Sequence, residues 1–206
     1  MTTMTKFAIL SIAAAATISC YGQPKPGDRP VGGACDGCEL MYENMPVNLL
    51  AEAVIRNEAD PGEPMIIEGT IFKKDGKTPA PGVILYVYHT DAKGYYSNPK
   101  TKGNRHGHLR GWIKTGADGK YKFTTIKPAP YPGDQIPAHV HPLVKEEGMT
   151  LYWIDEYLFD SDPLVTEEVK RKEQKRGGNG IIHLTKRDNV WIAKRDIILG
   201  MNIPNY

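Results

Sequence analysis

Short apolar runs separated by turn residues dominate the chain from residue 65 onward. Residues 65–72 read as a strand, and residues 83–88 are rich in the β-branched and aromatic side chains that favour a central strand. Turn signals at Asp75-Gly76 and Pro81-Gly82 separate these two runs. Six further runs have a similar character: 111–114, 120–124, 138–145, 149–157, 181–184 and 190–194. The pattern therefore predicts an all-β fold, a β-sandwich of seven or eight short strands with long loops and little helix.

Two other segments carry a weaker signal. Residues 49–56 are expected to form a short helix after a loop. Residues 166–176 mix Glu with Lys and Arg, which favours a solvated helix or loop. Because acidic residues interleave with the basic ones there, the segment does not predict a basic patch.

Length and composition favour a single domain. The chain has 206 residues, of which 40% are hydrophobic and 24% charged, enough for one real core. Its 21 Gly and 16 Pro suit a turn-rich β-protein. The formal net charge of +2 gives no electrostatic reason to expect nucleic acid or an anionic membrane surface as a partner.

The N-terminus is typical of an export signal. Lys6 precedes an apolar run over residues 7–18 that is too short to span a bilayer but suits a secretory signal. The run ends at Thr17-Ile18-Ser19-Cys20, which resembles a bacterial lipoprotein cleavage site with Cys20 lipidated. We therefore expect a signal over 1–20, a Pro- and Gly-rich tether over 21–34 and a domain over 35–206, held at a membrane only by a lipid anchor. The alternative is simple secretion, periplasmic or extracellular.

Cysteine usage agrees with export. Lipidation of Cys20 would leave Cys35 and Cys38, an even number in an oxidising compartment, and predicts a short disulfide between them. Buried thiols are one alternative. Metal binding is another, but one CxxC without a second pair is a weak zinc signal.

The candidate chemistry centres on two histidines. His139 and His141 are two residues apart, so on a strand both imidazoles leave the same face, as two ligands of one metal must. Paired exposed His residues on a strand are the alternative. The pair stands in Pro137-Ala138-His139-Val140-His141, after Asp91-Ala92-Lys93-Gly94-Tyr95-Tyr96 and Pro128-Ala129-Pro130-Tyr131-Pro132. In this order, within residues 65–164, the three motifs resemble the C-terminal domain of the intradiol ring-cleavage dioxygenases.

The resemblance implies a ferric site whose ligands are Tyr96, Tyr131, His139 and His141. Two phenolates and two imidazoles suit Fe(III), whereas copper(I) or structural zinc would favour thiolates. For each Tyr, core packing is the alternative. The family cleaves a small aromatic diol with O2, between the two hydroxyl-bearing carbons, to a muconate-type dicarboxylate. Its second Tyr leaves the metal and accepts a substrate proton, a role that falls to Tyr131; no organic cofactor is implied.

Two positions depart from the family pattern. Ile136 stands where many members have Arg, and Glu156 where members often have Gln; both positions are expected at the substrate pocket. The missing cation predicts slow turnover of simple catechols, and a carboxylate cannot donate as an amide does unless protonated. Arg105 and Arg110 are candidates for a cation supplied from elsewhere.

A binding module is the competing hypothesis. The strands and turns alone also resemble transthyretin-like and other adhesive sandwiches tethered to bacterial surfaces, which need no iron. Such a module does not account for the two Tyr motifs and the His motif occurring together.

Overall fold

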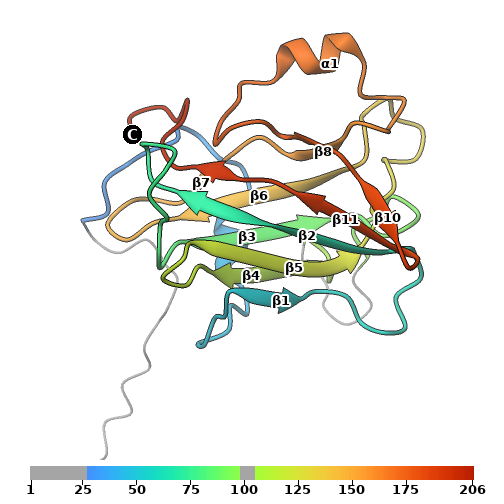
Figure 1. The fold of residues 1–206 in the computed structure, drawn as a ribbon, viewed down its shortest axis with the longest axis horizontal. Helices are drawn as coiled ribbons and strands as arrows, with labels where there is room; N and C mark the ends of the chain where they lie inside the picture. The colour runs from blue at the N-terminus through green and yellow to red at the C-terminus, as the bar shows by residue number, and fades with distance from the viewer. Residues whose placement is uncertain (1–26, 98–104) are drawn as a thin grey trace, which may run out of the picture.

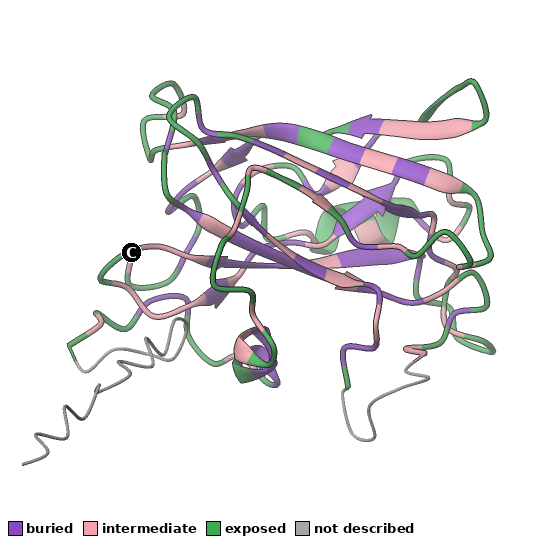
Figure 2. Ribbon diagram, turned by 90° about the horizontal axis from the view of Figure 1, so that it is seen from below, coloured by how far each residue is buried: buried purple, intermediate pink, exposed green. Residues whose placement is uncertain are grey.

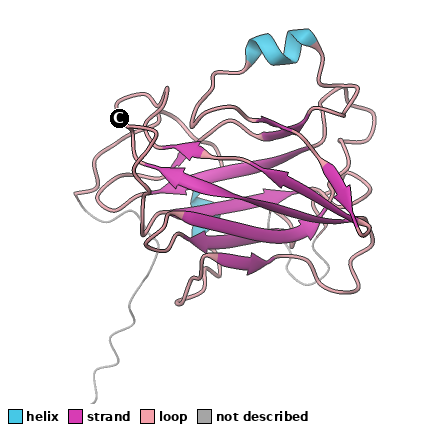
Figure 3. Cartoon of the chain, in the orientation of Figure 1, coloured by secondary structure: helices cyan, strands magenta, loops and turns pink. Residues whose placement is uncertain are grey.

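The structure is a computed structural model that describes residues 27–97 and 105–206 (Figure 1). In this part of the chain, twelve strands form two six-stranded sheets. The first sheet contains β1 (Glu52–Val54), β5 (Lys120–Ile126), β2 (Pro64–Phe72), β11 (Val190–Lys194), β10 (Thr185–Arg187) and β12 (Ile197–Ile198). The second contains β4 (Arg110–Lys114), β3 (Ile84–His89), β6 (His139–Lys145), β8 (Tyr157–Phe159), β9 (Ile181–Ile182) and β7 (Tyr152–Trp153). The predicted all-β sandwich with little helix is confirmed (Figure 3).

The core lies between the two sheets and follows from strand alternation. Along β2 the buried positions Met65, Ile67 and Ile71 face inward, and β5 pairs with this strand in antiparallel register. The buried positions in Figure 2 run along the strands, while exposed positions gather in the loops. A two-layer packing with a half-solvated outer face explains the period-2 signal in the sequence.

Strand β3 is buried on both faces. Leu85 and Val87 join the core between the sheets, whereas Tyr86 packs on the opposite face with Met41 of a 3-10 helix, η1 (Cys38–Tyr42). The strand lies between β4 and β6, as the expectation of a central strand requires.

Some predicted elements differ from the structure. The helix expected over 49–56 is wrong, because this segment forms β1, whose flanking backbone bonds to β5 from Ala51 to Ile55. The run 149–157 is two strands, interrupted where Asp155 turns its side chain to the backbone N–H of Lys175. The charged segment does contain a helix, α1 (Glu167–Lys172), with Thr166 as its N-cap.

The N-terminal segment lies against the sandwich from residue 29. Arg29 forms a β-bridge with Met149, Val31 is buried in the core and the N–H of Gly32 donates to the carbonyl of Pro204. The expectation of a tether over 21–34 therefore differs from the structure in residues 29–34, since Val31 provides an apolar anchor. Residues 21–26 lie outside the described part. Within the described residues, none of the helices has the length and apolarity to cross a membrane.

Candidate metal centre

The four predicted ligands come from three segments that meet at one end of the second sheet. His139 and His141 leave the face of β6 that points away from the core, since the intervening Val140 is buried within it. Tyr96 follows the turn after β3, and Tyr131 lies in the proline-rich loop between β5 and β6.

The donor atoms of these side chains converge. The Tyr96 hydroxyl oxygen lies 2.6 Å from that of Tyr131 and 3.0 Å from His141 Nε2. The Tyr131 oxygen lies 3.2 Å from His139 Nε2 and 3.5 Å from His141 Nε2. The two Nε2 atoms are 2.9 Å apart. Each of the four atoms is therefore within 3.5 Å of at least two others, the arrangement that ligands of one ion require.

The phenols are indispensable to this donor set. In residues 27–97 and 105–206, no group of three or more His, Cys, Asp or Glu side chains could hold a metal ion. Two phenol oxygens and two imidazole nitrogens form a hard, oxygen-containing set that fits a ferric ion. Tyr95, next to Tyr96, is 58% exposed, which leaves Tyr96 as the tyrosine of that motif that faces the histidines.

Burial favours the neutral form of Tyr96, Tyr131 and His139 when no cation is present. It raises the pKa of Tyr96 and of Tyr131 above the usual range for a phenol, and the hydrogen bond between the two hydroxyls raises the pKa of Tyr96 further. Burial, with the charge of His141 beside it, lowers the pKa of His139 to about 4. A bound cation would reverse the phenol shifts, because it favours the phenolate strongly.

An aromatic stack supports His141 from β3. Tyr88 is the cross-strand neighbour of His141, and their ring centroids lie 4.6 Å apart in a stacked arrangement. Tyr88 also stacks on His106, with ring centroids 3.6 Å apart, and the Tyr86 hydroxyl lies 2.9 Å from His106 Nδ1. Sequence reasoning missed these residues. The period-2 spacing of Tyr86 and Tyr88 puts both on one face of β3, but only the register with β6 shows that this is the face of the histidine pair.

The two positions that depart from the family pattern lie differently. Glu156 Oε1 is 3.6 Å from His141 Nδ1, so this carboxylate reaches a candidate ligand directly. Ile136 is 45% exposed in the loop before β6, and its place in a substrate pocket stays a prediction.

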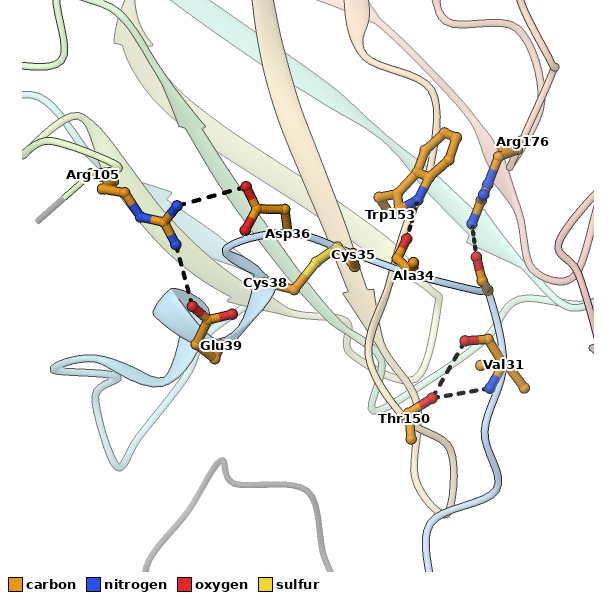
Figure 4. Close-up of a disulfide and its surroundings, with 11 residues drawn as sticks. Val31, Ala34, Cys35, Asp36, Cys38, Glu39, Arg105, Thr150, Trp153 and Arg176 are labelled. Carbon is orange, nitrogen blue, oxygen red and sulfur yellow. Dashed lines mark hydrogen bonds and ion pairs between the residues drawn. A yellow bond between two sulfur atoms is a disulfide. The ribbon is translucent and has the colours of Figure 1, made fainter.

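The two arginines considered as substitute cations have other partners. Arg105 pairs with Asp36 and Glu39 (Figure 4), and Arg110 lies over the Trp112 ring.

Cys35 and Cys38 are joined by a disulfide in the structure (Figure 4). Together with Tyr88, His141 and Glu156 they line a pocket of 180 Å³. The N-terminal segment therefore contributes a wall beside the donor cluster. Cys20 lies outside the described residues, and its lipidation stays a prediction.

Comparison with known proteins places this arrangement in a family. Residues 42–190, more than half of the chain, match a family model described as "Dioxygenase". The chain belongs to the intradiol ring-cleavage dioxygenase family. Catechol 1,2-dioxygenase 1 of Acinetobacter lwoffii is 31% identical over 153 residues, covering 62% of this chain and 48% of the relative. Hydroxyquinol 1,2-dioxygenase of Rhizobium sp. (strain MTP-10005) is 32% identical over 117 residues, covering 49% and 39%. This intradiol family member thus spans about half the length, or less, of these curated relatives.

Solved structures share the fold. The dioxygenase domain of a dioxygenase carbohydrate-binding protein fusion from Streptomyces sp. SirexAA-E has a TM-score of 0.58 at 22% identity, covering 75% of this chain and 91% of that one. Catechol 1,2-dioxygenase from Acinetobacter sp. ADP1 has a TM-score of 0.55 at 21% identity, covering 72% and 56%. These matches show the fold alone, whereas the family follows from the family model, and none of these comparisons supports the transthyretin-like alternative.

Proposed function

We propose that this protein is a non-haem, Fe(III)-dependent intradiol dioxygenase that cleaves a catechol-type ring with O2 to a muconate-type dicarboxylate. The observation that carries the proposal is the convergence of Tyr96, Tyr131, His139 and His141 on one point. The names of the relatives, which include catechol and hydroxyquinol 1,2-dioxygenases, support an aromatic diol as the substrate class.

The four converging side chains would hold the iron. Iron(III) bound there would supply a Lewis acid that stabilises the doubly deprotonated diol and makes its ring susceptible to dioxygen. The protein's own contribution is to hold two imidazoles and two phenols in one cluster before substrate enters, so that little reorganisation is needed.

Tyr131 is the residue suited to accept a substrate proton. A diol must lose two protons to bind through both oxygens, and the Tyr131 phenolate oxygen can take one of them as a general base. Pro130 and Pro132 restrict the backbone on either side of Tyr131. The phenol of Tyr131 would therefore make room for the substrate by side-chain rotation. Tyr96 would remain in place as a ligand beside His141.

Iron analysis of protein made without a purification tag tests the proposal. We expect about one iron per chain, visible phenolate-to-iron absorption and O2 consumption with catechol that yields a muconate-type product. Tyr96→Phe should lose the iron or the absorption, whereas Tyr95→Phe, the exposed neighbour, should behave as the parent. A parent protein that stays colourless and iron-free after folding in excess Fe(III) would refute the proposal.

A further inference from the structure

The two histidines of the donor cluster are supported in different ways. Both present Nε2 to the cluster, so their Nδ1 atoms point elsewhere. His139 Nδ1 lies 2.7 Å from the carbonyl oxygen of Pro137. Because a carbonyl oxygen can only accept, His139 must carry its proton on Nδ1, which leaves the Nε2 lone pair for a metal. His141 Nδ1 instead faces a carboxylate, that of Glu156, at 3.6 Å.

The backbone beside Glu156 is fixed by its neighbours. The preceding residue, Asp155, donates its N–H to the carbonyl of Arg176 and accepts the N–H of Lys175 on its carboxylate. The Asp155 carbonyl accepts a hydrogen bond from Arg195, whose side chain is buried. Glu156 is therefore presented to His141 from a tightly bonded segment between β7 and β8, whereas a free loop would place its carboxylate poorly.

The charge of Glu156 is directed at His141. Among the described residues, neither Lys nor Arg forms an ion pair with Glu156, and its ion-pair contact is with His141. A carboxylate behind a metal-bound imidazole fixes the tautomer and ring orientation and makes the nitrogen a stronger donor. A second carboxylate, Asp36, lines the same pocket but pairs with Arg105.

We infer that Glu156 is a positioning residue for the metal centre: its carboxylate attracts the proton on His141 Nδ1 across the 3.6 Å contact, holds Nε2 toward the ion and makes His141 the stronger of the two imidazole donors. This inference rests on the proposed function in that it assumes a metal at the cluster. It assigns to Glu156 a role toward the metal in place of a direct contact with substrate.

The test compares iron retention in Glu156→Leu, Glu156→Gln and Asp36→Asn. Removing such a supporting carboxylate typically weakens metal affinity by about 10- to 100-fold. We expect Glu156→Leu to release iron to EDTA faster by that order, and Glu156→Gln by less, because its amide oxygen still carries a partial negative charge beside His141 Nδ1. Asp36→Asn removes a charge from the same pocket without touching His141 and should match the parent. The phenolate-to-iron band should shift to longer wavelength only in the Glu156 variants, because an ion that receives less electron density from His141 is the stronger acceptor.

A second measurement needs neither iron nor a variant. In metal-free parent protein at alkaline pH, nitrogen NMR should show His141 protonated on Nδ1. An Nε2-protonated His141, or equal iron loss in Asp36→Asn and Glu156→Leu, overturns the inference. If the parent takes up no iron but His141 is protonated on Nδ1, the proposed function fails while the assigned contact stands.

Discussion

The two tyrosine-bearing loops meet at Gly94, and this contact predicts how the metal centre can be broken without touching a ligand. Gly94 has φ of 84°, and a Cβ built on it would lie 2.1 Å from the carbonyl oxygen of Pro130 and 2.9 Å from Cδ of Pro132. Those prolines flank Tyr131, while Gly94 itself lies two residues before Tyr96. Gly94→Ala should therefore push the Tyr131 loop away from Tyr96.

Gly94→Ala should reduce the catalytic rate by more than its backbone cost in folding free energy alone would suggest. A non-glycine residue at positive φ costs roughly 1 kcal/mol. Real Cβ atoms stay at least 3.0 Å from such neighbours, so the loop must move by about 1 Å, which is more than the ~0.5 Å tolerance of a preorganised site. A displacement of that size can cost on the order of 10²-fold in rate. The Tyr96–Tyr131 oxygen distance of 2.6 Å would open by a similar amount.

Gly133→Ala is the matched control. Gly133 lies in the same loop with φ of 80°, but nothing lies within 4 Å of its added Cβ. Both variants should lose roughly 1 kcal/mol in free energy of unfolding from the backbone alone, measured by urea unfolding. Only Gly94→Ala should lose iron affinity, the visible band and catechol turnover. Equal iron affinity in the two variants would show that the contact between Gly94 and the proline loop does not set the tyrosine positions.

Three further predictions concern other parts of the chain. Loss of a fixed cation at an anionic intermediate costs on the order of 10²-fold in rate. Ile136→Arg should therefore leave iron binding intact and raise activity on catechol relative to a bulky alkyl- or aryl-substituted catechol. An unchanged activity ratio would place Ile136 away from the substrate. We propose that lipid on Cys20 anchors the exported protein, so Cys20→Ser should release it from membranes on fractionation, and equal membrane association would remove the anchor. Burial lowers the pKa of His89 to about 4 from 6.5, so the unfolded chain binds a proton that the folded chain does not as pH falls through this window. The free energy of unfolding should therefore drop by about 2 kcal/mol per such group between pH 7 and pH 5, and His89→Gln should flatten that drop in urea titrations unless another group causes it.

The sequence predicted the strands well where their signal is local. In residues 65–72 and 120–124 buried positions alternate with more accessible ones, and β2 and β5 follow these ranges closely. The sequence pattern gave the wrong element where pairing with a distant strand decides the structure. Residues 49–56 have a composition compatible with a helix, but the backbone of Glu52–Val54 finds its partners along β5, and such long-range pairing leaves no mark on the segment itself.

In the candidate site too, the residues in local motifs were predictable and the long-range contacts were not. Tyr96, Tyr131, His139 and His141 could each be named from a short motif, and the structure brings all four together. The supporting contacts could not be named. Glu156 reaches His141 across β6 and β8, and its role depends on a distance that no spacing in the sequence encodes.

Substitutions near the motifs fall into two kinds, those that affect the substrate and those that affect the metal. The motifs determine which atoms can bind a metal. We predict that the contact of Gly94 with the proline loop and the stack of Tyr88 on His141 set how closely those atoms approach. Ile136 is exposed and belongs to neither contact, so we predict that a substitution there acts on the substrate and leaves the metal ligands in place. A substitution at Glu156 would act through His141 on the metal itself. The two departures from the family pattern should therefore have independent effects, and combining Ile136→Arg with Glu156→Gln should give a change in catechol turnover close to the product of the two single changes.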